Sequence, residues 1–231
     1  MNVRAAGLWL VYMVAGLAGR AQDADALIKR VKEKLNGVND YQAQGVMKTD
    51  VSFMKVPESK VTIFYKRPNK FKIKKQDGIS IVPRGGGNIN LAALLEGNNY
   101  TAVPAGKGQL NGAPVTIIKL LPLDEKSDVV VSALHIDEKE ALVKKAVITT
   151  RENGTYEMEM LYGNYADWGL PDKIIFTFNL KDYKLPKGMT FEYENGENKA
   201  KDNSAKSKKG SIEIQYSSYT INKGIADASF Q

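Results

Sequence analysis

The stretch that decides the fold runs from Val61 to Val82 and reads VTIFYKRPNKFKIKKQDGISIV. It opens with Val61, Ile63 and Tyr65 at a spacing of two, which places alternate side chains on one face of a β-strand. Pro68 has no amide hydrogen to donate to a neighbouring strand. The Arg-Pro-Asn sequence around it therefore predicts a break in the pairing or a position at a sheet edge.

The second half of this stretch predicts another strand and a turn. Phe71 and Ile73 alternate with lysines, so one face is apolar and the other is basic. The sequence Gln76-Asp77-Gly78 follows, and its glycine suits a tight turn. Arg67 is therefore expected at a strand break, beside large apolar side chains.

The first 21 residues have the pattern of a secretory signal peptide. A basic start that includes Arg4 precedes an apolar run from Leu8 to Leu17, and Gly19-Arg20-Ala21 supplies small residues for cleavage between Ala21 and Gln22. The alternative is an uncleaved membrane anchor, but the run is shorter than the roughly 20 residues that a spanning helix needs. We expect export to the periplasm of a double-membraned bacterium, or to the exterior of another cell.

Charge and cysteine content narrow the class of protein. Cleavage leaves 210 of the 231 residues and lowers the net charge from +7 to +5, because Arg4 and Arg20 are lost. That mild excess favours acidic partners or anionic lipid head groups without requiring either. The chain has no cysteine, which excludes disulfides, thiol nucleophiles, thiolate metal sites and a lipid-modified N-terminal cysteine.

The periodicity predicts a mainly β, α+β domain over residues 22–231. Leu27, Ile28, Val31 and Leu35 follow helical spacing and predict one amphipathic helix from Asp23 to Asn36. The remaining regular segments are rich in β-branched and aromatic residues and are bounded by turn signals. The predicted strands are Tyr41–Val51, Ser59–Lys66, Val115–Leu121, Val129–Ile136, Leu142–Arg151, Tyr156–Tyr165, Lys173–Asn179, Met189–Glu194 and Ser211–Tyr219.

Two segments interrupt this pattern. Residues 84–114 are rich in glycine, contain a short apolar helix from Ile89 to Leu95 and show no clear strand. Because loops of this length in compact domains are usually lids or binding loops, we expect a lid-like insertion. Residues 195–210 form a polar, lysine-rich tract, which predicts a flexible loop.

Catalytic patterns are weak. His135 is the only histidine, so a zinc site with several histidines is excluded, and no Gly-x-Ser-x-Gly motif accompanies it. The acidic cluster around Asp137 and Glu138 reads as a solvated turn. Glu157 and Glu159 share one strand face, and paired carboxylates can hydrolyse glycosides. A secreted hydrolase that acts through carboxylates is therefore kept as an alternative function. We expect that the protein is not an enzyme and that it uses neither a cofactor nor a metal ion.

Phosphate and nucleic-acid sites are also weakly supported. The glycines after Arg84 lack the lysine and the strand–loop–helix context of a phosphate-binding loop. Lysines interleave with Phe64 and Phe71, as in binders of single strands, but a basic outer sheet face explains them equally well. We expect no nucleic-acid partner and a monomeric protein.

The interior expected from these strands is apolar and suits acyl chains. Each methylene group buried there contributes about 0.8 kcal/mol to the free energy of binding. The residues predicted to line this cavity are Val61, Ile63, Tyr65, Phe71, Ile73, Leu91, Leu94, Leu95, Ile117, Ile174, Phe176 and Phe178.

The segment YKRPNKF, Tyr65–Phe71, resembles the LolA-type periplasmic carriers of outer-membrane lipoproteins, in which an Arg-Pro pair precedes an aromatic residue three positions after the proline. The order of signal peptide, helix and strands is similar, and so are Gly112–Leu123 and Ser211–Asn222. The glycine-rich residues 84–114 and the tract 195–210 depart from the family's pattern.

The resemblance implies a strongly curved, half-open antiparallel barrel covered by the N-terminal helix and a lid segment. It implies a cavity for lipoprotein acyl chains, received from an inner-membrane donor complex and passed to an outer-membrane acceptor. It also implies that Arg67 is a latch that bonds to the lid backbone and holds the empty form shut. Relatives of this fold include lipoprotein-sensing anti-sigma regulators and glycolipid carriers, so both roles stay open as alternatives.

Overall fold

The computed structural model describes residues 23–51, 54–55, 57–76, 91–95, 99–179 and 209–230. Five predictions lie wholly or partly outside these residues. They are the signal peptide (1–21), residues 77–78 of the turn after Gln76, residues 84–90 and 96–98 of the lid-like insertion, the strand Met189–Glu194 and residues 195–208 of the flexible loop.

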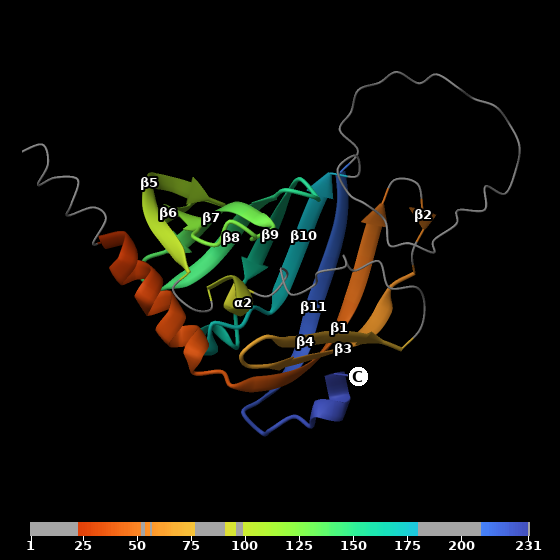
Figure 1. The fold of residues 1–231 in the computed structure, drawn as a ribbon. Coiled ribbons are helices and arrows are strands. Elements are labelled where there is room, and N and C mark those ends of the chain that lie inside the picture. Colours follow the sequence, from red (N-terminus) through yellow and green to blue (C-terminus); the bar gives the residue numbers. More distant parts are fainter. Residues whose placement is uncertain are drawn as a thin grey trace, which may run out of the picture.

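A helix over residues 23–36 covers one end of the sheet (Figure 1). Its buried side chains are Ala24, Leu27, Ile28 and Val31, which recur at the spacing that places them on one helical face. The predicted amphipathic helix is therefore confirmed. No helix among the described segments is long and apolar enough to cross a membrane.

The described residues form one antiparallel sheet whose ladder runs β4-β3-β1-β11-β10-β9-β8-β7-β6-β5, with β2 paired to β1. Strongly bent and not closed, the sheet makes a half-open barrel with the helix across one end (Figure 1). The strands are β1 (Asp40–Val51), β2 (Met54–Lys55), β3 (Ser59–Lys66), β4 (Lys70–Lys75), β5 (Tyr100–Leu110), β6 (Ala113–Pro122), β7 (Val129–Asp137), β8 (Leu142–Thr150), β9 (Thr155–Leu161), β10 (Lys173–Asn179) and β11 (Lys209–Ile221).

The concave face of this sheet is the core. One row of paired residues crosses seven neighbouring strands, from β6 to β1, and every member is buried. The row is apolar until its last residue and consists of Ile118, Leu134, Ala146, Met158, Phe176, Ile212 and Thr49. Because side chains alternate between faces, the neighbouring row lies on the convex side. It consists of Ile117, His135, Lys145, Glu159, Ile175, Glu213 and Lys48.

Strands β1 and β11 approach each other closely at Gly45. The register shifts between Gln44 and Gly45, which marks a bulge. A Cβ atom at Gly45 would lie 2.6 Å from the backbone oxygen of Gln215. Only glycine fits here without a backbone shift.

The expectation that residues 84–114 contain no strand is wrong for residues 100–110, which form β5 at the edge of the sheet. Pro104 is tolerated because an edge strand need not donate every amide. A bulge between Pro104 and Gly106, where Gly106 has φ of 106°, bends the strand. Within the same segment α2 (Leu91–Leu95) is helical, as predicted.

Candidate functional site

Helix α2 lies in the hollow of the sheet (Figure 1). Leu91 and Leu95 are 9% and 2% exposed and belong to the same apolar core as the concave rows, with Ala92 and Leu94 packed against it. A helix of five residues has almost no stability of its own, because nucleation is costly and few hydrogen bonds follow it. Its position therefore depends on these apolar contacts.

Beside α2 lies a small hollow, which we call the inner pocket. Its volume of about 40 Å³ has room for about two water molecules but not for an acyl chain. It is lined by Leu35, Val38, Tyr41, Tyr65, Phe71, Leu91, Ala92, Met158, Met160, Tyr162, Gly169, Leu170, Pro171, Ile174, Tyr216 and Tyr219.

Tyrosine rings form one wall of the inner pocket without making it polar. The ring centroids of Tyr41 and Tyr219 are 5.3 Å apart, and those of Tyr216 and Tyr219 are 5.0 Å apart. The hydroxyl groups of Tyr162 and Tyr219 donate to the carbonyl oxygens of Val143 and Pro171 at 2.9 and 2.8 Å. Burial raises the pKa of Tyr41, Tyr162, Tyr216 and Tyr219. The wall is therefore uncharged and presents mainly ring carbon to the pocket.

Eleven of the twelve side chains predicted to line the cavity lie on the apolar interior. Tyr65, Phe71, Leu91 and Ile174 line the inner pocket itself. The others are buried in, or packed against, the same core: Val61, Ile63, Leu95, Phe176, Phe178, Ile73 and Leu94.

Ile117 must be corrected. It pairs with His135 on the convex row, whereas its neighbour Ile118 faces the concave core. The run of apolar residues around it gives no alternation from which the inward face could be read. Sequence reasoning also missed Met158, Met160, Tyr216 and Tyr219 as lining residues, although the methionines alternate with two glutamates and so marked a face.

Arg67 follows β3 in the turn to β4, at a cis Arg67–Pro68 peptide bond. Its Nη1 atom donates to the carbonyl oxygen of Asn36 at 3.3 Å, and its backbone N–H donates to Asn39 O at 2.9 Å. Asn36 is the last residue of the N-terminal helix, where carbonyl groups lack partners within the helix. The contact joins the β3–β4 hairpin to that helix. Residues 84–90 of the lid-like insertion lie outside the described ranges, so the latch to the lid remains a prediction.

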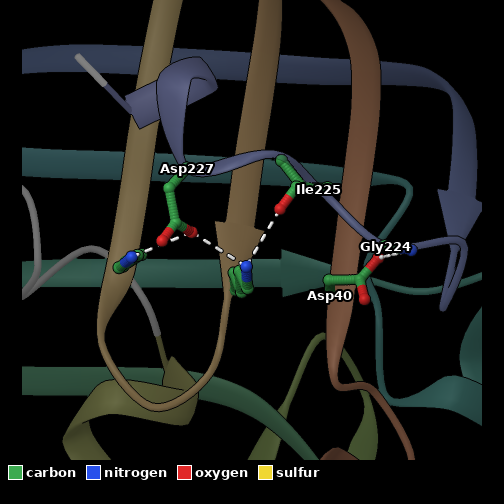
Figure 2. A network of polar contacts seen from close by, with 6 residues as sticks. Asp40, Gly224, Ile225 and Asp227 are labelled. Carbon is green, nitrogen blue, oxygen red and sulfur yellow. Dashed lines mark hydrogen bonds and ion pairs between the residues drawn. The ribbon is translucent and has the colours of Figure 1, made fainter.

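A second contact fixes the same hairpin from outside, through η3 (Asp227–Phe230) (Figure 2). Asp227 Oδ1 accepts from Lys66 Nζ at 2.8 Å and forms an ion pair with Lys70 Nζ at 2.9 Å. Lys66 Nζ also donates to Ile225 O at 3.0 Å. The hydrogen bonds from Lys66 and Lys70 lower the pKa of Asp227 to about 2. We call this contact the hairpin clamp.

The convex face carries the other candidate polar groups. Lys145 Nζ lies 2.6 Å from Glu157 and 3.2 Å from Glu159, and its hydrogen bond lowers the pKa of Glu157. Burial, and then the charge of Lys145, lower the pKa of His135. Across the described ranges no three His, Asp or Glu side chains gather closely enough to hold a metal ion.

No family model matches the chain, and no curated protein sequence matches it. Several solved structures do match the chain. A LolA superfamily protein from Nitrosomonas europaea aligns with a TM-score of 0.60 at 11% identity, over 90% of this chain and 97% of that one. A DUF1329 family protein from Desulfovibrio piger has a TM-score of 0.56 at 11% identity, over 91% and 97%.

A putative outer membrane lipoprotein-sorting protein domain from Vibrio parahaemolyticus has a TM-score of 0.54 at 13% identity, again over 91% and 97%. Identities this low show the fold alone. With its curved antiparallel sheet, its covering helix and these structural matches, the chain has a LolA-like fold.

Proposed function

We propose that this chain is a periplasmic carrier that binds lipoprotein acyl chains on its concave face and moves them from the inner to the outer membrane. The observation that carries the proposal is the row of buried residues on the concave face, apolar across the six strands from β6 to β11, together with the short helix α2 that packs on the same core. Two of the three structural matches carry LolA or lipoprotein sorting in their names.

The inner pocket is too small for cargo, so the proposal requires α2 to move. Lifting α2 exposes Leu91 and Leu95, at a cost of about 1.5–3 kcal/mol each, or roughly 3–6 kcal/mol together. A single acyl chain that buries about twelve methylene groups gains roughly 10 kcal/mol. The gain from cargo exceeds the cost of opening, so an empty closed form and a loaded open form can both be stable.

Arg67 has the position that suits a latch in this scheme. Its contact with Asn36 O ties the hairpin to the covering helix, and the hairpin clamp holds the same hairpin at Asp227. Both contacts are polar and lie at the surface, so they can break without exposing core. We propose that Arg67 stabilises the closed, empty form, and that donor and acceptor complexes at the two membranes act on it. The proposal assigns no catalytic residue.

The test is lipid extraction from protein purified from its native compartment, with mass spectrometry of the extract, followed by binding of a triacylated lipoprotein in vitro. We expect co-purified acyl lipid and a measurable affinity. Phe71→Glu places a carboxylate at the inner pocket and should abolish binding, because an unpaired charge is costly in an apolar site. Lys74→Glu, on the opposite face of β4, is the matched control. Wild-type affinity in the Phe71 variant would contradict the proposal.

A further inference from the structure

A second hollow is lined by residues of the N-terminal helix and of strands β5 and β6. These strands lie at the end of the sheet away from β3 and β4 (Figure 1). We call it the helix-edge pocket. Its volume of about 800 Å³ is within the range of roughly 300–1,000 Å³ that is usual for small-molecule sites. Unlike the inner pocket, it has room for a ligand without any movement of α2.

The floor of the helix-edge pocket is apolar. Ala24, Leu27 and Ile118 line it and are 4%, 7% and 0% exposed. Ile118 is also the first residue of the concave row, so the floor is continuous with the core. The bulged part of β5 forms the opposite wall, and beside Gly106 there is open space where a side chain would otherwise stand. A hydrocarbon chain laid here would cover Ala26 and Pro104, which also line the pocket and are exposed.

The rim of the helix-edge pocket is charged, and its cations, Arg30 and Lys107, can each contact a ligand. Arg30 Nη2 donates to Lys139 O at 3.3 Å, which leaves further N–H groups of the five in a guanidinium for a ligand. Lys107 Nζ lies 3.7 Å from Glu138 Oε1, and its side chain is 80% exposed. That long, exposed contact is weak and is easily exchanged for another carboxylate.

The cations on the rim favour an anionic head group. Two cations, Arg30 and Lys107, stand with two carboxylates, Asp23 and Glu138, and Thr116 Oγ1 donates to Glu138. A ligand carboxylate can take the place of Glu138 beside Lys107 and accept hydrogen bonds from Arg30. We propose that the helix-edge pocket binds a single-chain amphiphile with a carboxylate head, its tail on Leu27 and Ile118 and its head between Arg30 and Lys107. This site is separate from the interior that we propose for lipoprotein acyl chains, and binding there does not require α2 to open.

The test is calorimetric titration of the mature chain with dodecanoate, dodecyl phosphate and dodecanol, each below its aggregation concentration. We expect dodecanoate to bind about tenfold more tightly than dodecanol, since each 1.4 kcal/mol corresponds to a factor of ten. Dodecyl phosphate should also bind more tightly than dodecanol, because its anionic head is attracted by the same two cations. Equal affinity for dodecanoate and dodecanol would overturn the assignment of the head group.

Substitutions locate the site. Lys107→Gln and Arg30→Gln should each weaken dodecanoate binding about tenfold and leave dodecanol unchanged, while Lys29→Gln, one position along the helix and outside the pocket, changes neither. Ala26→Trp should fill the pocket and abolish binding of both. Unchanged binding in the Ala26 variant would overturn the proposal.

Phe71→Glu separates this site from the carrier interior. We expect it to block triacylated cargo and to leave dodecanoate binding intact. Loss of dodecanoate binding in that variant would place the single chain in the interior and refute the helix-edge site, without touching the carrier proposal. Intact cargo binding together with weakened dodecanoate binding in Lys107→Gln would support two separate sites, whereas wild-type cargo binding in Phe71→Glu would contradict the carrier proposal alone.

Discussion

Truncation of Leu95 to alanine separates a lid from a fixed part of the core. Leu95 is 2% exposed and is one of the two buried leucines that hold α2 in the hollow of the sheet. Leucine-to-alanine changes at buried positions cost about 2–5 kcal/mol. We take the lower end, about 2 kcal/mol, because a helix of five residues can settle into the space that the change leaves.

The consequence depends on whether α2 opens by itself. If it does, Leu95→Ala lowers the stability of the closed form relative to the open form by about 2 kcal/mol. The open population then rises about thirtyfold. Uptake of a fluorescent diacyl lipid, followed by stopped flow, should accelerate by a similar factor. Hydrogen exchange of residues 91–95 should accelerate equally, because these amides exchange through local opening. The melting temperature should also fall, by roughly 4–8 °C, since the closed form is the starting state of global unfolding as well.

Leu134→Ala is the matched control. Leu134 is fully buried in β7 and belongs to the concave row. The same truncation there should lower the melting temperature by roughly 4–20 °C, at about 2–4 °C per kcal/mol for a chain of this size, and should not accelerate uptake. If Leu95→Ala leaves both uptake and the hydrogen exchange of residues 91–95 unchanged, as the control does, α2 is part of the fixed core and the reasoning fails.

Four further predictions test the contacts of Arg67 and Asp227, the titration of His135 and the close approach of β1 and β11 at Gly45. Arg67→Leu should still load a triacylated lipoprotein but release it more slowly in a transfer assay, because the closed empty form loses a stabilising contact; unchanged transfer would refute the latch. Asp227→Asn should reduce stability in thermal unfolding above about pH 4, since a lowered pKa stabilises the folded state while the carboxylate is charged; this difference from wild type should vanish as the pH falls through about 2. The imidazole NMR signal of His135 should titrate below its usual pKa of 6.5, and protonation in that range should lower stability, because the folded state favours the neutral ring; a midpoint at or above 6.5 would contradict its burial. Gly45→Ala should cost about 1–3 kcal/mol in denaturant unfolding, since its Cβ would meet the backbone of Gln215; a neutral substitution would show that the close approach of the strands is absent in solution.

The strands around the Arg-Pro turn could be read from the sequence because each buries one face only. Val61, Ile63 and Tyr65 are buried while the residues between them are half-exposed, so the alternation survives in the sequence. The strands predicted over Tyr41–Val51 and Ser59–Lys66 are both present, and they pair with one another as β1 and β3. Alternation of this kind fixes both the strand and the face that points inward.

Strand β5 was missed because its composition is that of a loop. Pro104, Gly106 and Gly108 all lie within it, and each lowers the tendency to form a strand in isolation. At a sheet edge these residues are tolerated, since one side of the strand has no partner to satisfy. Edge position is a property of the assembled sheet and is not encoded in the local pattern.

The candidate site was predictable in kind but not in detail. Large apolar residues near the turn identified the interior, yet the inner pocket also draws Met160 from β9 and Tyr216 from β11. Which strands lie opposite the turn depends on the bend of the whole sheet. The helix-edge pocket had no signal in the sequence, because its wall comes from the bulge in β5 and its rim from a turn more than one hundred residues beyond Arg30.

The partnership of β1 with β11 has a consequence for synthesis. Asp40 and Asn222, whose contact closes this seam, stand 182 positions apart in the chain. Strands β3 and β4 reach the rest of the sheet only through that seam, so a ribosome must make nearly all of the polypeptide before the two halves can join. Topologies with such distant pairings fold slowly and keep apolar strands uncovered meanwhile. The nascent chain should therefore be an unusually persistent client of holding chaperones.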